Sequence, residues 1–108
     1  VLIRALEPIE GWECMSVRRK RPRLKRDLCN GPGKLTQALG IDLKQNGCDL
    51  TTQPLFVLNR DPVADSQVRV SPRIGIVHAT DMLLRYFVKN NDFVSRHAFN
   101  RDAIPYAL

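Results

Sequence analysis

The most informative stretch of this sequence is Leu28-Cys29-Asn30-Gly31-Pro32-Gly33-Lys34-Leu35-Thr36-Gln37-Ala38-Leu39-Gly40. It contains residues that commonly begin and end a short helix. Asn30 or Gly31 can cap the start, Pro32 suits the first helical position, and Gly40 suits a left-handed stop at the end. The pattern therefore predicts a helix of about two turns.

The start of this predicted helix has the features of an anion site. Gly31 and Gly33 leave the first backbone N–H groups uncovered, and Lys34 lies one turn further on. Helix starts of this kind hold phosphate groups. A well-capped connector helix without a ligand explains the same residues equally well. The stretch is not a Walker A loop, because Leu28 replaces its first glycine and Leu35 replaces its Ser or Thr.

The segment before this helix is the most basic part of the chain. Residues 18–26 read Arg-Arg-Lys-Arg-Pro-Arg-Leu-Lys-Arg and carry seven of the 17 Lys and Arg side chains. Mutual repulsion and Pro22 predict an exposed loop. Two interpretations stay open, a solvated loop and a loop that contacts phosphates. The net charge of +6 favours a polyanionic partner such as nucleic acid but does not establish one.

The rest of the chain predicts short strands and one more helix. The expected elements are a strand at residues 1–6, a helix at 9–19, and strands at 55–58, 68–70, 73–77 and 84–88. Turns are expected at 46–47 and 89–92, and residues 97–108 show no periodicity and read as a tail. The pattern predicts an α+β fold with short antiparallel strands, in one domain or part of one. The chain begins inside a predicted strand, so we expect a piece of a longer protein.

Cysteines, histidines and acidic residues suggest no metal or catalytic site. The spacing of Cys14, Cys29 and Cys48 argues against zinc ligation and against a disulfide framework, and favours reduced, partly buried thiols in a cytosolic protein. No apolar run is long enough to span a bilayer, and no signal peptide is evident. His78 is expected to be partly buried and bonded to backbone, although nearby Asp81 leaves a proton-transfer role open. His97 has no triad partners.

Three glutamates near the start are expected to be structural. Glu7, Glu10 and Glu13 are three residues apart and could share one face of the predicted helix. Carboxylates at a helix start are stabilised by the helix dipole. This role explains them without any catalysis, so none is predicted to be a general base.

Four stretches, in order, resemble the alkyladenine (3-methyladenine) DNA glycosylase family in its bacterial form. They are residues 1–11 (Val-Leu-Ile-Arg-Ala-Leu-Glu-Pro-Ile-Glu-Gly), residues 28–39, Arg73-Ile74-Gly75-Ile76, and Arg85-Tyr86-Phe87 together with Phe93-Val94-Ser95-Arg96. The resemblance covers residues 1 to about 96. It implies that residues 1–108 are the carboxy-terminal part of a single glycosylase domain, with residues 97–108 as the tail.

The resemblance implies a DNA repair activity without a cofactor or metal. The family turns an alkylated or deaminated purine out of duplex DNA and hydrolyses its N-glycosidic bond with a glutamate-activated water. It assigns the backbone carbonyl of Arg4 to the attacking water. It places Gly31, Pro32, Gly33, Lys34, Arg73, Ile74 and Gly75 beside the DNA. The implied partner is double-stranded DNA with a damaged purine. No membrane or obligate protein partner is implied. The complete protein is expected to be a cytoplasmic, nucleoid-associated monomer.

The resemblance also implies what this chain lacks. The family's catalytic glutamate, its pocket residues and its intercalating tyrosine match positions upstream of Val1, so the chain alone is expected to be inactive. The implied fold is a curved, mostly antiparallel sheet with flanking helices, similar in shape to formyltransferase carboxy-terminal domains and incomplete here. Part of such a fold would leave strand edges and apolar faces uncovered. Two alternatives remain, a non-catalytic nucleic-acid-binding module and a small RNA- or tRNA-binding domain.

Overall fold

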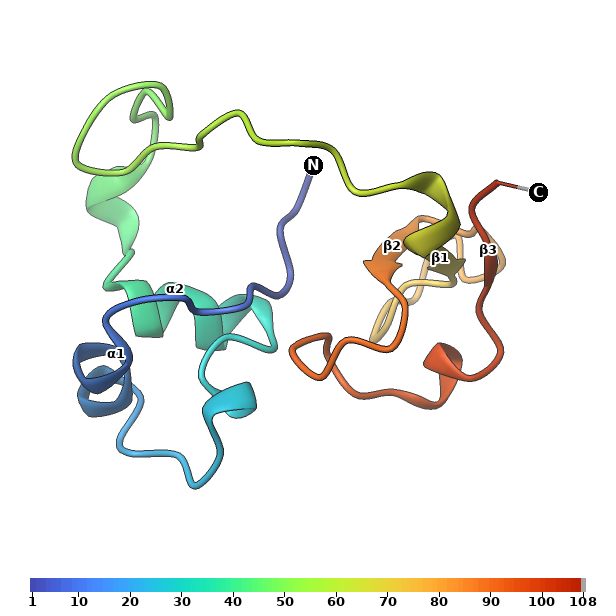
Figure 1. Ribbon diagram of the computed structural model, residues 1–108, viewed down its shortest axis with the longest axis horizontal. Helices are drawn as coiled ribbons and strands as arrows, with labels where there is room; N and C mark the ends of the chain where they lie inside the picture. The colour runs from blue at the N-terminus through green and yellow to red at the C-terminus, as the bar shows by residue number, and fades with distance from the viewer. Residues whose placement is uncertain (108) are drawn as a thin grey trace. The chain divides into compact units, whose positions relative to one another are not determined.

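Helices and strands occupy different parts of the chain. In the computed structural model, which describes residues 1–107, both α-helices of the described chain lie in the unit Val1–Pro62 and its strands lie in the unit Val63–Leu108 (Figure 1). The elements are α1 (Trp12–Arg18), η1 (Lys25–Asp27), α2 (Pro32–Leu39), η2 (Leu43–Gln45), η3 (Asp65–Gln67), β1 (Val68–Ser71), β2 (Arg85–Val88), η4 (Ala98–Asn100) and β3 (Ile104–Pro105). The predicted α+β class is confirmed.

Helix α2 forms where its end signals predict it. It begins at Pro32 after an extended Gly31, and it ends where Gly40 takes a left-handed φ of 69°. The N–H groups of Gly40 and Ile41 donate to the carbonyls of Gln37 and Thr36 at 3.2 and 2.8 Å. These bonds satisfy carbonyls that a helix end otherwise leaves unpaired. The prediction succeeded because both ends of this helix are set by local residues.

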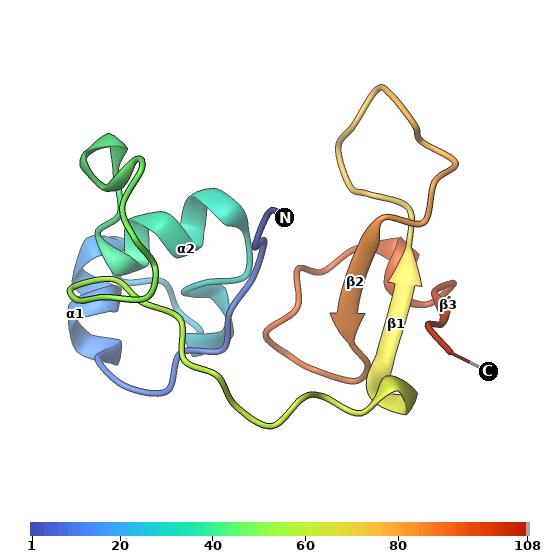
Figure 2. The same ribbon diagram turned by 90° about the horizontal axis from the view of Figure 1, so that it is seen from above.

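The core of the first unit lies between α1 and α2. Its buried apolar residues are Leu28, Cys29, Leu35 and Ala38, with Met15 and Leu39 packed against them. Leu35 and Ala38 are three residues apart, so they lie on one face of α2. Ala38 is 0% exposed, and its short side chain lets the two helices approach closely. Figure 2 shows α1 and α2 side by side.

The first residues of the chain are not a strand, so that prediction is wrong. Residues 1–9 have no assigned secondary structure, and α1 begins at Trp12 rather than at residue 9. Leu6 N–H donates to the carbonyl of Cys29 at 3.0 Å. No strand of the described chain pairs with this segment, and an extended segment becomes a strand only when a neighbour supplies the ladder.

Two further predicted strands are also wrong, because no strand of the described chain pairs with either segment. At residues 55–58, Val57 N–H bonds back to the carbonyl of Leu50 at 2.8 Å. At residues 73–77, the backbone turns at Ile74 and Gly75, and Gly75 has a φ of +67°. A left-handed residue of this kind interrupts the alternation of a strand.

The sheet of the second unit has the order β2-β1-β3, with both pairs antiparallel. The strands predicted at 68–70 and 84–88 are confirmed as β1 and β2. Residues 97–108 were expected to be a tail, yet within them η4 forms and β3 pairs with β1, placing Ile104 opposite Val70. A two-residue strand is too short to show a period of two in the sequence.

A buried arginine joins the strands to the segment that follows them. Arg85 is 6% exposed, and its guanidinium donates to Ser71 Oγ at 3.1 Å and to the carbonyl of Ser95 at 3.0 Å. The guanidinium carbon lies 4.4 Å from the centre of the Phe87 ring. The hydrogen bonds and ring contact of Arg85 therefore hold the interior of this unit together where other proteins have apolar side chains.

Candidate nucleic-acid interface

The start of α2 exposes backbone donors to the surface. The first intrahelical bond runs from Leu35 N–H to the carbonyl of Gly31 at 2.8 Å, so the N–H groups of Gly33 and Lys34 precede the helical ladder. No side chain caps this end. A Cβ placed on Gly33 would have no atom within 4 Å. The start of α2 is therefore open to an anion.

A chain of hydrogen bonds positions the cation at this helix start. Lys34 Nζ donates to Asn30 Oδ1 at 3.0 Å, and Asn30 Nδ2 donates to Asp27 Oδ1 at 3.1 Å. Asn30 is buried at the head of α2. The sequence pattern predicts Asn30 only as a cap, and its spacing of three from Asp27 and four from Lys34 is the signal for this further role. These two hydrogen bonds turn the Lys34 ammonium back towards the free N–H groups at the start of α2.

The basic segment 18–26 is less available than its sequence suggests. Arg18 Nη1 donates to the carbonyl of Ala38 at 3.0 Å. Arg19 donates from Nε to the carbonyl of Leu28 and from Nη2 to that of Asp27, both at 3.0 Å. Lys25 Nζ lies 2.7 Å from the centre of the Trp12 ring. The prediction of one exposed loop is wrong for Arg18, which ends α1, and for half-buried Arg19. It is also wrong for Lys25 and half-buried Arg26, which begin η1.

The segment with Arg4 is tied to the head of α2. Arg4 is half-buried, and two residues later the Leu6–Cys29 bond fixes the backbone beside the residues that precede the helix. Trp12 Nε1 also donates to the carbonyl of Pro8 at 2.9 Å. The structure thus fixes the course of the backbone on the carboxy-terminal side of Arg4.

The turn at Arg73, Ile74 and Gly75 lies in the second unit. Arg73 Nη2 donates to the carbonyl of His78 at 3.2 Å, which braces the turn. A Cβ on Gly75 would have no atom within 4 Å, so its backbone faces open space. His78 is exposed, so the expected partial burial is wrong. This arises because residues 73–77 form a turn and not a buried strand.

The candidate residues therefore divide between the two units. Arg4 and the residues from Gly31 to Lys34 belong to the first unit, and the turn at 73–75 belongs to the second. Within the first unit, the Leu6–Cys29 bond brings the Arg4 segment to the head of α2. Each unit offers backbone donors beside a basic side chain, which is an arrangement suited to phosphate oxygens.

Acidic residues and cysteines show no catalytic arrangement within residues 1–107. Glu7, Glu10 and Glu13 are all exposed, and no group of three His, Cys, Asp or Glu in this part of the chain could hold a metal ion. Cys14 and Cys48 are exposed, which corrects the expectation of partly buried thiols, whereas Cys29 is buried.

Two groups have shifted pKa values with structural causes. Burial raises the pKa of the Cys29 thiol, and the positive charge of Arg19 partly opposes this rise. Hydrogen bonds from the Thr51 hydroxyl and then from its backbone N–H lower the pKa of Asp49. A raised thiol pKa makes Cys29 a poor nucleophile at neutral pH. No helix among the described residues is long and apolar enough to cross a membrane.

Comparison with known proteins identifies relatives over most of the chain. The profile of the family described as Methylpurine-DNA glycosylase matches residues 1–92. A protein of Prosthecochloris aestuarii is 45% identical over 96 residues, covering 89% of this chain and 46% of the relative. A protein of Francisella tularensis is 46% identical over 99 residues, covering 89% of this chain and 51% of the relative.

A third relative, from Carboxydothermus hydrogenoformans, is 45% identical over 97 residues, covering 89% of this chain and 50% of the relative. All three bear the name "Putative 3-methyladenine DNA glycosylase". The chain spans about half the length of the curated relatives it matches.

Proposed function

Because the chain belongs to the methylpurine-DNA glycosylase family, we propose that residues 1–108 are the carboxy-terminal part of one glycosylase domain in a bacterial DNA repair enzyme. The observation that carries this proposal is the identity of 45% over 89% of the chain. The enzyme would turn a damaged purine out of the duplex and hydrolyse its N-glycosidic bond. Its partner would be chromosomal duplex DNA, bound by a single copy of the protein.

The contribution of this part of the enzyme is to hold the DNA backbone. The N–H groups of Gly33 and Lys34 can donate to one phosphate, and the Lys34 ammonium, directed by Asn30, adds a positive charge beside them. The turn at Arg73–Gly75 supplies a second contact. Open space lies where a Cβ of Gly75 would be, and the Arg73 guanidinium, which braces the turn through Nη2, adds its positive charge beside it. Phosphate contacts set the register of the duplex without reading its sequence.

We assign the carbonyl of Arg4 to positioning the attacking water. A carbonyl oxygen can only accept, so it would hold the water by one O–H while a base removes the other proton. The anchored Leu6–Cys29 bond keeps this segment in place. The acids near the start are poor candidates for that base, since Glu7, Glu10 and Glu13 are exposed and catalytic acids and bases are characteristically desolvated. The base would come from the other part of the domain.

Uncovered apolar side chains support the proposal of an incomplete domain. Leu43 and Val77 are 91% and 87% exposed. Further large apolar side chains with more than half of their surface exposed in the first unit are Leu2, Ile3, Ile9, Val17, Val57 and Leu58. Large apolar side chains exposed in such number indicate surface that another part of a protein covers. The remaining part of the glycosylase domain is the occupant that the family assignment supplies.

The function is tested by base release from duplex DNA that contains one hypoxanthine or one ethenoadenine. The full-length protein should release the damaged base, and the 108-residue chain alone should release none. Absence of release by the full-length protein, across both lesions and 3-methyladenine, would refute the proposed activity. Release by the 108-residue chain would instead place the general base among its own acids.

The phosphate contacts are tested by replacing Lys34 and Arg73 with Ala in the full-length protein. Each substitution should lower the slope of log K against log salt by about 0.9, the value for one lost phosphate contact. Lys44→Ala is the matched control, because Lys44 is an exposed lysine in η2 and belongs to neither candidate segment, and its slope should stay near that of the wild type. If Lys34→Ala and Lys44→Ala give the same slope, Lys34 makes no phosphate contact.

A further inference from the structure

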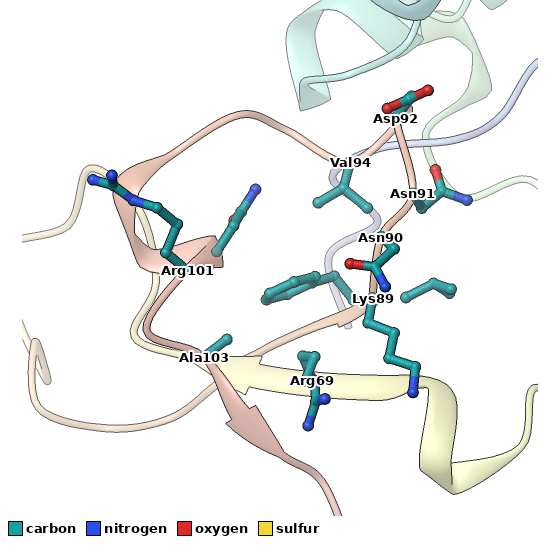
Figure 3. Close-up of a pocket in the computed structure, with 11 residues that line it drawn as sticks. Arg69, Lys89, Asn90, Asn91, Asp92, Val94, Arg101 and Ala103 are labelled. Carbon is teal, nitrogen blue, oxygen red and sulfur yellow. The ribbon is translucent and has the colours of Figure 1, made fainter.

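A second basic site lies in the strand unit, in a hollow of about 710 Å³ beside β1 and β2. Figure 3 shows its lining, in which the charged and amide side chains come from three separate parts of the sequence. These side chains are those of Arg69, Lys89, Asn90, Asn91, Asp92, Asn100 and Arg101. Three cations and one carboxylate give the hollow an excess of positive charge.

The strand register brings two of these cations together. Arg69 lies opposite Phe87 in the antiparallel pair. Lys89 N–H donates to the carbonyl of Gln67 at 2.8 Å, so the pairing continues one step beyond β2. Because side chains alternate along a strand, Arg69, Phe87 and Lys89 share one face of the sheet. Arg69 and Lys89 are diagonal neighbours there, about 7–8 Å apart at their backbones.

These cations lack partners within the described chain. No hydrogen bond or ion pair among residues 1–107 uses the side-chain nitrogens of Arg69, Lys89 or Arg101. Arg85, on the same sheet face as Arg69, is held by Ser71 and Ser95 instead. Figure 3 shows Asp92 away from Arg69 and Lys89, so it does not neutralise them. Neighbouring like charges without a counter-charge gain most when a polyanion neutralises them.

The turn after β2 adds neutral donors to the same hollow. Asn91 Oδ1 accepts from the backbone N–H of Phe93 at 2.8 Å. This bond fixes which end of the amide is occupied and leaves the NH2 group, a double donor, for a ligand. Donors on a fixed turn beside two cations on a sheet suit phosphate oxygens, which only accept.

We propose that this hollow binds phosphates of the DNA strand that lie about four nucleotides from those held by the turn at Arg73–Gly75. This inference rests on the proposed function. Arg69 and Arg73 are four residues apart. At a strand rise of about 3.3 Å per residue, their backbones are separated by up to roughly 13 Å. That length equals about four nucleotides of axial rise along one DNA strand. The hollow thereby lengthens the stretch of backbone that the second unit can hold.

The experiment measures the salt dependence of binding of the full-length protein to an undamaged duplex. The triple variant Arg69→Gln/Lys89→Gln/Arg101→Gln should lower the slope of log K against log salt by about 2 to 3. The matched control is Lys44→Gln/Arg60→Gln/Arg96→Gln, which removes the same charge from exposed cations outside the hollow. An equal fall in the control would show a general effect of net charge and overturn the proposal.

Two further variants keep the test independent of folding. Lys89→Gln/Arg101→Gln leaves the central strand unchanged and should lower the slope by about 2. Asp92→Asn removes the carboxylate of the hollow, so it should tighten binding severalfold. Unchanged binding in both variants would overturn the proposal even if the triple variant failed to fold.

A free anion is distinguished from the DNA backbone by NMR. Duplex DNA should shift the amide signals of Asn90, Asn91 and Arg101, and inorganic phosphate at the same phosphate concentration should not. Equal shifts would make the hollow a site for free phosphate and overturn its assignment to DNA. No DNA binding by the full-length protein would count against the proposed function itself. Binding that none of the variants alters would count against the hollow alone.

Discussion

The helical unit and the strand unit both hold their small cores with arginine side chains, but they bury these arginines to different degrees. In the helical unit, Arg19 donates to the carbonyls of Asp27 and Leu28 and remains half-buried. In the strand unit, Arg85 is 6% exposed, bonds to Ser71 and Ser95, and stacks on Phe87. The helical unit also has four buried apolar residues, whereas Val70 is the buried apolar residue of the described part of the strand unit. The strand unit therefore depends more on its arginine.

The same comparison shows that a high density of basic residues in the sequence does not mean that their charges are free to contact a ligand in the structure. Segment 18–26 is the densest basic run, yet it uses Arg18 and Arg19 to satisfy carbonyls of the helical unit. The cations at 69, 89 and 101 are scattered in the sequence, yet they line one hollow and bond to no neighbour within residues 1–107. A guanidinium that already donates to backbone carbonyls of its own unit is less available to a phosphate than one without such partners.

The largest expected effect is on the buried arginine of the strand unit. Arg85→Ala should lower the free energy of unfolding by about 2–3 kcal/mol, because two charge-assisted bonds and the contact with Phe87 are lost. Arg19→Ala, its counterpart in the helical unit, should cost about 1 kcal/mol, since water can replace its bonds at a half-exposed site. Urea denaturation followed by circular dichroism measures both. Equal losses would remove the proposed difference between the two units.

The contrast between units also explains which elements the sequence could predict. Helix α2 is set by Pro32, Gly40 and its own apolar face, all within one short segment. The segments 1–6 and 73–77 have the residue types of strands, but strand formation requires a neighbouring strand that local sequence does not reveal. The strand predictions for these two segments are wrong because of tertiary context, although the residue types do favour strands.

The candidate sites divide in the same way. The head of α2 was predicted because its glycines, proline and lysine are consecutive. Asn30 was noticed as a cap and missed as the residue that directs Lys34. The sequence does not predict the hollow, because Arg69, Lys89 and Arg101 line one hollow only through the register of β1 with β2 and through the turn after η4. No sequence window contains all three.

A smaller effect is expected at the glycine of the turn in the strand unit. Gly75 has a φ of +67° and open space where a Cβ would lie. Gly75→Ala should therefore cost about 1 kcal/mol of stability from backbone conformation alone, with no steric clash added. Gly75→Asn should cost less, because Asn tolerates this conformation better. Urea denaturation tests both variants. Equal losses for Ala and Asn would mean that something other than backbone conformation selects glycine there.

The smallest expected change in stability concerns Gly33 in the helical unit, and its sign is opposite. Gly33 is helical and also has open space around a Cβ, so Gly33→Ala should raise stability by about 0.5 kcal/mol through helix propensity. The added methyl group would stand between a phosphate and the N–H groups of Gly33 and Lys34. DNA binding by the full-length protein should therefore weaken severalfold while its melting temperature rises. If the variant is more stable and its DNA affinity equals that of the wild type, Gly33 has no role in DNA binding at the helix start. It would then have no role there at all, since the backbone conformation at this position does not require glycine.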